Sequence, residues 1–105
     1  MSNSTNYPQA DDAVSHNTYF DGKVQSLGLE TANGKATLGV MKKGEYTFST
    51  SSSEKMVVLS GTMEVKLDGI LFHTYNEHDE FEVSAGVSFE VKCNADVAYL
   101  CYYGQ

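Results

Sequence analysis

The sequence predicts an all-β protein, an antiparallel sandwich or barrel of jelly-roll type with about nine strands and little or no helix. After Tyr19, short segments of alternating apolar and polar residues are separated by turn signals at regular spacing. No stretch shows a sustained apolar period of about 3.6 residues, as an amphipathic helix would. A length of 105 residues fits one domain. We expect that domain over residues 19–105, after a loosely ordered polar tail over residues 1–18.

Two hairpins are predicted from short turn sequences. Residues 30–40, ETANGKATLGV, carry Asn33-Gly34 between two alternating segments, which is the strongest local signal for a tight hairpin turn. Residues 63–75, MEVKLDGILFHTY, carry Asp68-Gly69 after a similar alternation. Each range is therefore expected to form a pair of antiparallel strands.

Two further ranges read as strands with one apolar face. Residues 44–50, GEYTFST, place aromatic side chains at every second position. Residues 80–93, EFEVSAGVSFEVKC, alternate on both sides of a Ser-Ala-Gly turn. The apolar positions of these segments are the predicted core.

The last predicted strand, residues 97–103 (VAYLCYY), is apolar on both faces. Such a strand needs cover on both sides, and the sequence predicts no helix to supply it. A homodimer is the simplest source of that second layer. The alternative is that the N-terminal tail covers this strand.

Charge and composition exclude several classes of partner. The net charge is −7, with seven Lys and no Arg, which argues against nucleic acid and against an anionic membrane surface. A phosphate site would have to use N–H groups, hydroxyls or Lys. No apolar run is long enough to span a bilayer, and the N-terminus does not resemble a secretory signal. We therefore expect a cytoplasmic protein in which Cys93 and Cys101 are buried free thiols.

Two sequence motifs resemble those of the cupin superfamily of small jelly-roll barrels. Glu54, six intervening residues and Gly61 match the end of the first motif, and HDEFEVSAGVSF (residues 78–89) matches the second. The three histidine ligands of these motifs are replaced by Phe48, Thr50 and Phe89. One remaining carboxylate does not make a transition-metal site, which needs three or more protein ligands. We predict a pocket that binds no metal.

A closer resemblance covers residues 19–103. YFDGKVQSLG, ATLGVMKKGEYTFSTSSSEKMVVLSGTMEV and YLCYY are similar to the small single-domain cupins of the pyrimidine/purine nucleoside phosphorylase family. The resemblance implies phosphorolysis of many purine and pyrimidine nucleosides to the free base and ribose 1-phosphate. Phosphate is then a co-substrate, and no cofactor is expected.

Glu54 is the predicted catalytic residue. A carboxylate accepts hydrogen bonds from ribose hydroxyls, and its charge stabilises the positive charge that develops on the sugar ring as the base leaves. The alternative is a Glu at the barrel rim that is paired with Lys55 or Lys66.

The hydroxyl-rich stretch STSSS, residues 49–53, is the predicted phosphate site, with Thr50 and Ser51 as substrate-binding residues. Hydroxyls and N–H groups of a turn bind anions. The alternative is an ordinary polar loop, because Ser and Thr favour turns for local reasons.

Aromatic and sulfur-containing side chains form the predicted surface for the base. Strand parity turns them toward one face, where they would stack on any base with little discrimination. The alternative is that they form only the core. The residues are Tyr46, Phe48, Met56, Phe89 and Tyr99.

Two other functions stay open at this point. The chain could be a metal-free barrel that binds a small sugar-like or aromatic ligand without turnover, or a structural dimer with a residual pocket. Fold alone does not separate these functions, because one barrel architecture hosts many activities.

Overall fold

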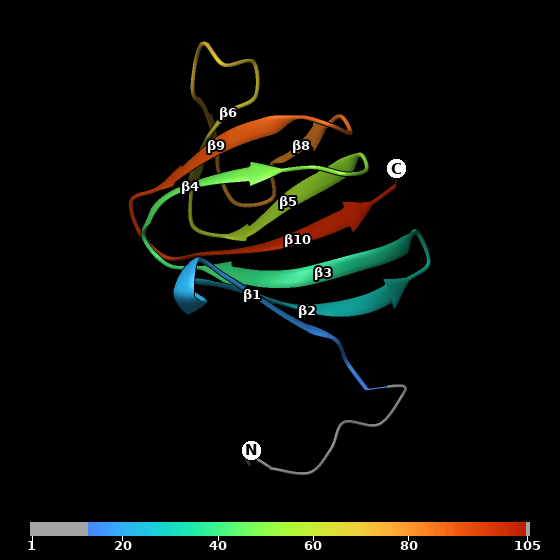
Figure 1. Ribbon diagram of the computed structural model, residues 1–105. Helices are drawn as coiled ribbons and strands as arrows, with labels where there is room; N and C mark the ends of the chain where they lie inside the picture. The colour runs from blue at the N-terminus through green and yellow to red at the C-terminus, as the bar shows by residue number, and fades with distance from the viewer. Residues whose placement is uncertain (1–12, 105) are drawn as a thin grey trace.

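The computed structural model describes residues 13–104, which form two antiparallel sheets packed around one core (Figure 1). Ten strands and one short 3-10 helix make up the described residues. They are β1 (His16–Tyr19), η1 (Phe20–Gly22), β2 (Val24–Thr31), β3 (Gly34–Met41), β4 (Gly44–Ser49), β5 (Glu54–Ser60), β6 (Met63–Lys66), β7 (His73–Tyr75), β8 (Glu80–Val83), β9 (Ser88–Cys93) and β10 (Val97–Tyr103).

The strand order is that of a jelly roll. One sheet has the order β1-β2-β3-β10-β5-β8 and the other has the order β4-β9-β6-β7. From β3 to β10 the chain passes repeatedly between the two sheets, and all strand pairs are antiparallel. This arrangement confirms the predicted fold class. Within residues 13–104, no helix is long and apolar enough to cross a membrane.

Strand β1 lies in a range that the sequence assigned to the tail. Residues 16–19 pair with residues 24–27 of β2, so the folded part begins before the predicted boundary at residue 19. The segment HNTY lacks apolar alternation, and its pairing uses backbone hydrogen bonds and side-chain contacts such as His16 Nε2 with Gln25 Oε1 at 3.0 Å. Residues 1–12 of the predicted tail lie outside the described residues.

The predicted turns join strands as expected, with one difference in length. The β2–β3 hairpin forms as predicted, but its two-residue loop is Ala32-Asn33, one residue before the predicted Asn33-Gly34, because Thr31 pairs with Gly34. Asp68-Gly69 lies in a longer loop between β6 and β7. Asp68 Oδ1 accepts hydrogen bonds from the N–H groups of Ile70 and Leu71. Gly69 has φ = 75°, a conformation that glycine adopts without strain.

The core contains the side chains that the alternation placed inside. Met63 and Val65 of β6 are fully buried, and Phe81 and Val83 of β8 belong to the same buried cluster. Cys93 and Cys101 are free and buried, as expected.

Strand β10 is at the centre of the six-stranded sheet, between β3 and β5 (Figure 1). Tyr99 and Cys101 point into the barrel and are buried, whereas Leu100 and Tyr102 on the other face are partly exposed. The partner chain that we predicted over this outer face stays a prediction at this stage.

Candidate active site

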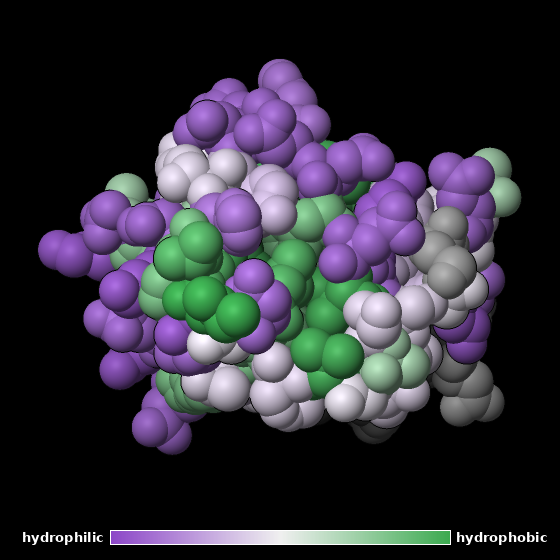
Figure 2. All heavy atoms as spheres, turned by 90° about the horizontal axis from the view of Figure 1, so that it is seen from above, coloured by the Kyte–Doolittle hydropathy of each residue, from purple (hydrophilic) through white to green (hydrophobic). Residues whose placement is uncertain are grey.

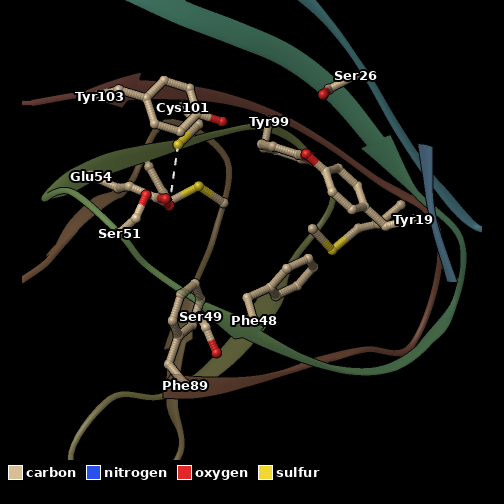
Figure 3. Close-up of a pocket in the computed structure, with 12 residues that line it drawn as sticks. Tyr19, Ser26, Phe48, Ser49, Ser51, Glu54, Phe89, Tyr99, Cys101 and Tyr103 are labelled. Carbon is tan, nitrogen blue, oxygen red and sulfur yellow. Dashed lines mark hydrogen bonds between the residues drawn. The ribbon is translucent and has the colours of Figure 1, made fainter. Parts of the chain in front are cut away.

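A cavity of about 260 Å³ lies between the two sheets. Its volume is close to the lower end of the range of about 300–1,000 Å³ found for small-molecule sites. Strands of both sheets supply its walls, and Figure 3 shows their side chains directed toward a common space. The lining residues are Tyr19, Ser26, Met41, Phe48, Ser49, Ser51, Glu54, Met56, Phe89, Tyr99, Cys101 and Tyr103.

The cavity has two chemically different ends (Figure 3). Glu54 and Ser51 lie at one end, next to Cys101 and Tyr103. Aromatic rings, among them those of Tyr19, Phe48 and Tyr99, lie at the other end. One end can therefore exchange hydrogen bonds with a polar ligand group, and the other presents ring faces to a flat one.

Glu54 is held at the polar end by its place in the sheet. It is the first residue of β5, where it pairs with Val83 of β8 and Tyr103 of β10. The thiol of Cys101 lies 3.5 Å from Glu54 Oε1 and donates a weak hydrogen bond to it. Burial raises the pKa of Glu54 above its usual value, and the Cys101 hydrogen bond opposes this shift.

The salt-bridge alternative for Glu54 is wrong. Lys55 Nζ lies 3.9 Å from Glu80 Oε1, and Lys66 Nζ lies 3.2 Å from Glu90 Oε2. Within residues 13–104, neither lysine forms an ion pair with Glu54. The carboxyl group thus faces the cavity, and no charged group of the described residues pairs with it.

Cys101 acts here as a neutral neighbour of Glu54. Burial, followed by the charge of Glu54, raises the pKa of the Cys101 thiol to about 12. The thiolate form, which is the nucleophile, is therefore negligible at neutral pH. The residue serves in packing, as expected, and also contacts the carboxyl group.

The aromatic end is a set of rings in mutual contact. Phe48 lies 5.7 Å from Phe89, with an angle of 30° between the rings, and 5.5 Å from Phe20 in an edge-to-face arrangement. Phe20 belongs to η1 and is not itself a lining residue. Its ring also packs against that of Tyr46, with 5.0 Å between the ring centroids. Such contacts restrict the rings, so the surface offered to a ligand is largely formed in advance.

Tyr99 reaches the cavity across a glycine. Tyr99 of β10 pairs with Gly39 of β3, and its ring covers the Gly39 backbone. A Cβ atom at position 39 would lie 2.3 Å from the Tyr99 Cζ atom. The absence of a side chain at this position is what allows the ring to occupy its place.

The hydroxyl-rich stretch after β4 contributes two side chains to the cavity. Ser49 and Ser51 line it, and Ser49 Oγ lies 3.0 Å from Ser88 Oγ. Thr50, in contrast, is buried and outside the lining. Its hydroxyl donates to the Ser84 carbonyl oxygen at 2.7 Å and accepts from the Val87 N–H at 3.0 Å, which fixes the β8–β9 turn.

The structure brings six of the eight predicted site residues together around the cavity. These are Phe48, Ser51, Glu54, Met56, Phe89 and Tyr99. Thr50 and Tyr46 are not among the lining residues. Tyr46 is buried beside Phe20, and its hydroxyl donates to the Lys42 carbonyl oxygen at 2.6 Å. Tyr46 points to the same face of β4 as Phe48. It lies nearer the start of the strand, however, and the cavity reaches only Phe48 and Ser49.

Six lining residues were not among the eight predicted site residues, although one of them, Ser49, lies in the hydroxyl-rich stretch that was predicted to bind phosphate. Cys101 and Tyr103 follow Tyr99 at every second position of β10, so strand parity alone could have found them. Tyr103 also forms a hydrogen bond with Thr37 Oγ1 at 2.9 Å. Nothing in the local sequence marks Tyr19, Ser26 or Met41, which reach the cavity because of how β1, β2 and β3 are arranged.

The donor set does not resemble that of a metal centre. Within residues 13–104, no group of three or more His, Cys, Asp or Glu side chains lies together in a way that could hold a metal ion. Among the lining residues, Glu54 is the one carboxyl group, and none is Lys, Arg or His. Any anion at this site would therefore be bound by N–H and O–H donors.

A model of the pyrimidine/purine nucleoside phosphorylase family matches residues 14–103. The chain belongs to the pyrimidine/purine nucleoside phosphorylase family. The pyrimidine/purine nucleoside phosphorylase of Photobacterium profundum is 47% identical over 88 residues, which cover 83% of this chain and 95% of that protein. The resemblance that the sequence suggested is thereby confirmed.

Solved structures place the fold of this phosphorylase family member among the cupins. A Vibrio parahaemolyticus protein of unknown function has a TM-score of 0.80 and 39% identity, and the match covers 85% of this chain and 96% of that one. An RmlC-like cupin from Shewanella frigidimarina has a TM-score of 0.69 over 97% of this chain and 93% of its own, at 18% identity. The second likeness concerns the fold alone.

The position of Glu54 predicts a pH-dependent stability. Because the pKa of Glu54 is higher in the folded chain than in the unfolded one, the folded state keeps a proton over a range in which the unfolded state has lost it. This stabilising contribution is complete below the unfolded pKa of about 4.3 and is lost as the pH rises through the folded pKa. As the pH rises over that window, the Tm of the wild type should therefore fall relative to the Tm of Glu54→Gln, because Gln does not titrate.

Thermal unfolding of both proteins across this pH range measures the effect. Glu45→Gln is the matched control, since Glu45 is an exposed residue of β4 that does not line the cavity. A wild-type Tm that changes with pH in parallel with that of Glu54→Gln would contradict the raised pKa.

Proposed function

We propose that this protein phosphorolyses nucleosides, with phosphate as co-substrate, to the free base and ribose 1-phosphate. Membership of the phosphorylase family supports this function. The observation that carries it is the division of the cavity into a carboxyl and hydroxyl end and an aromatic end, because a nucleoside has a matching polar sugar and flat base.

The reaction assigns a role to each end. A phosphate oxygen attacks C1′ of the ribose from the face opposite the base, the C1′–N bond breaks, and its electron pair goes to the base nitrogen. Hydrogen phosphate supplies one proton to the overall balance, which the base gains. Positive charge builds up on the sugar ring in the transition state. The ionised carboxylate of the half-buried Glu54 stabilises that charge and accepts hydrogen bonds from the ribose hydroxyls.

Broad base specificity follows from the chemistry of the aromatic end. The cavity lining contains ring faces and the side chains of Met41 and Met56. Such surfaces stack on purines and pyrimidines alike and do not read their hydrogen-bonding edges. We therefore propose that the enzyme accepts both classes of nucleoside.

Phosphate would bind at the hydroxyl groups of Ser49 and Ser51 and at the N–H groups of the turn that follows β4. This binding mode relies on hydrogen bonds, because no cationic side chain from residues 13–104 lines the cavity. We expect phosphate affinity to be modest for the same reason, since charge-assisted hydrogen bonds are the stronger class.

The same feature favours a second candidate function. A cavity with one carboxyl group and no cation suits a neutral ligand better than an anion, because like charges repel strongly where water is scarce. In this alternative the protein binds a small sugar-like or aromatic molecule without turnover.

One assay separates the two functions. Release of free base from uridine and from adenosine is followed with and without phosphate. Release that requires phosphate and yields ribose 1-phosphate supports the phosphorylase. A rise in Tm with nucleoside but no phosphate-dependent release supports the binding protein. Release that is equally fast without phosphate would show hydrolysis and contradict both.

Metal removal should leave the protein unchanged. Phe48, Thr50 and Phe89 occupy the positions of the histidine ligands of cupin metal sites, so we propose a metal-independent reaction. Treatment with EDTA followed by dialysis should alter neither base release nor Tm. A tightly bound transition metal at one equivalent per chain, measured by elemental analysis of purified protein, would overturn this prediction.

A further inference from the structure

Three residues form a row across the inner face of the six-stranded sheet. Gly39 of β3 pairs with Ser26 of β2 on one side and with Tyr99 of β10 on the other. Directly opposed residues of an antiparallel pair point to the same face, and Ser26 and Tyr99 both line the cavity. Because Gly39 has no side chain, the Tyr99 ring lies over it, in the direction of Ser26. The row therefore brings two hydroxyl groups to the side of the cavity opposite Glu54 (Figure 3).

The Tyr99 hydroxyl is a buried polar group that the protein leaves available. Tyr99 is only 6% exposed, yet its hydroxyl forms no hydrogen bond with any of residues 13–104. Every fully enclosed side-chain nitrogen or oxygen atom of these residues has a hydrogen-bond partner, so the Tyr99 oxygen is open to the cavity that the residue lines. The equally buried Tyr46 differs, since its hydroxyl donates to the Lys42 carbonyl oxygen. Buried polar groups nearly always have a partner, and for Tyr99 the cavity has to supply it.

Ser26 adds a second hydroxyl of the same kind. It is 4% exposed, and its Oγ accepts a hydrogen bond from Asn17 Nδ2 at 3.3 Å. Within the described part of the chain, its own proton has no acceptor. A serine hydroxyl can accept and donate at the same time, so this proton remains free for a ligand. Ser26 is therefore a donor toward the cavity.

The departing base of a nucleoside needs such donors. As the C1′–N bond breaks, the electron pair moves onto the base nitrogen and spreads through the conjugated ring to the acceptor atom beside that nitrogen. This atom is O2 in a pyrimidine and N3 in a purine, and both accept hydrogen bonds. Donors that are aimed at an atom gaining negative charge lower the barrier, because the interaction is stronger in the transition state than in the ground state.

We propose that the Ser26 and Tyr99 hydroxyls form a base-binding subsite, in which they donate hydrogen bonds to O2 of a pyrimidine or N3 of a purine and stabilise the leaving base. This inference rests on the proposed phosphorylase function. It gives a catalytic role to the end of the cavity that would otherwise only stack on the base. Both classes of nucleoside carry this acceptor at the same place relative to the glycosidic bond, so the contact keeps the specificity broad.

Tyr99 donates a hydrogen bond without losing its proton. Burial is the largest cause that raises the pKa of the Tyr99 hydroxyl well above its usual value. The group is therefore neutral at physiological pH, and the proton that the base gains still comes from hydrogen phosphate. The subsite leaves the balance of the reaction unchanged.

Two nucleoside analogues test the contact. The analogue 3-deazaadenosine has a C–H group in place of N3, and 7-deazaadenosine has one in place of N7. Phosphate-dependent base release from both and from adenosine is measured for the wild type and for Tyr99→Phe, which keeps the ring and removes the hydroxyl. Tyr99→Phe should lower kcat by about 10² for adenosine and for 7-deazaadenosine. For 3-deazaadenosine the loss should be less than about threefold, because the acceptor is already absent. Uridine, which has O2, should behave like adenosine.

A second variant and a control accompany this measurement. Ser26→Ala should show the same dependence on N3. Tyr75→Phe is the matched control, since Tyr75 lies in β7 and is not a lining residue, and its rates should stay near those of the wild type. The Tm of Tyr99→Phe should also stay near that of the wild type, because this hydroxyl has no hydrogen bond to lose within residues 13–104.

The outcomes separate the subsite from the proposed function. If a variant loses equal activity on adenosine and 3-deazaadenosine, its hydroxyl does not contact N3, and that result for both variants overturns the subsite while wild-type release supports the function. A loss that vanishes with 7-deazaadenosine instead also overturns it. If the wild type releases no base, the function is wrong, and calorimetry decides on the subsite. The wild type should then bind adenosine about twofold to tenfold more tightly than 3-deazaadenosine, and Tyr99→Phe should bind both equally. Equal binding of both by the wild type would overturn the subsite as well.

Discussion

Replacement of Glu54 by Gln should reduce phosphate-dependent base release by about 10²–10³ and leave the fold intact. The loss of one preorganised electrostatic group of this kind is worth about 2.7–4 kcal/mol of transition-state stabilisation in enzymes. Gln keeps the size of Glu and an acceptor for the ribose hydroxyls, so nucleoside affinity should change little. The expected effect is on kcat rather than on KM.

Stability should move in the opposite direction to activity. Because burial disfavours the charged form of Glu54, the neutral Gln side chain should keep or raise the Tm at neutral pH. Base release, nucleoside affinity by calorimetry and Tm on the same preparation separate these effects, with Glu45→Gln as the control. Near-normal release by Glu54→Gln would remove this residue from the mechanism and leave the Ser49 and Ser51 hydroxyls as the remaining candidates.

Replacement of Gly39 by Ala should disable the aromatic end of the cavity without touching a ligand directly. The new Cβ atom would lie 2.3 Å from Tyr99 Cζ and 2.4 Å from its hydroxyl oxygen, distances that force the ring to move. The open space next to the ring is the cavity, which is only about 260 Å³ in volume. A displacement of about 1 Å at a reacting or positioning group costs about 10² in rate, and we expect a loss of at least this size.

A double-mutant cycle checks the physical cause. Gly39→Ala alone should also lower stability by about 1–3 kcal/mol, the usual cost of overpacking. In a Tyr99→Ala background the same change should cost much less, because the ring that it strikes is gone. The free energy of unfolding of all four proteins is measured by urea unfolding. If Gly39→Ala lowered it equally in both backgrounds, the effect of the substitution would not come from the contact with Tyr99.

The sequence predicted the fold well because the core follows strand alternation. Phe81, Val83 and Phe89 are buried as their parity required, and the β2–β3 hairpin turn lies within one residue of the expected Asn33-Gly34. Strand β1 was missed because its residues bury no apolar face. It forms by pairing with β2 at the edge of the six-stranded sheet, and that edge exists only in the folded chain.

The site was predicted less completely, for two physical reasons. Parity tells which face a side chain takes but not how far along a strand a cavity extends, so Tyr46 was included and Tyr103 was not. The hydroxyl-rich stretch 49–53 placed Thr50 among the substrate-binding residues, although its hydroxyl is bonded to the Ser84 and Val87 backbone. Tyr19 reaches the cavity through the tertiary arrangement alone.

The central position of β10 has a consequence for biosynthesis. Residues 97–103 are synthesised after all nine other described strands, yet they form the hydrogen-bonded link between β3 and β5. Until these residues leave the ribosome, the facing edges of β3 and β5 lack a partner, and unpaired edges are open to pairing with other chains. The nascent chain therefore cannot complete its larger sheet in stages. Folding must wait for its last strand, and the growing polypeptide needs protection from aggregation up to that moment.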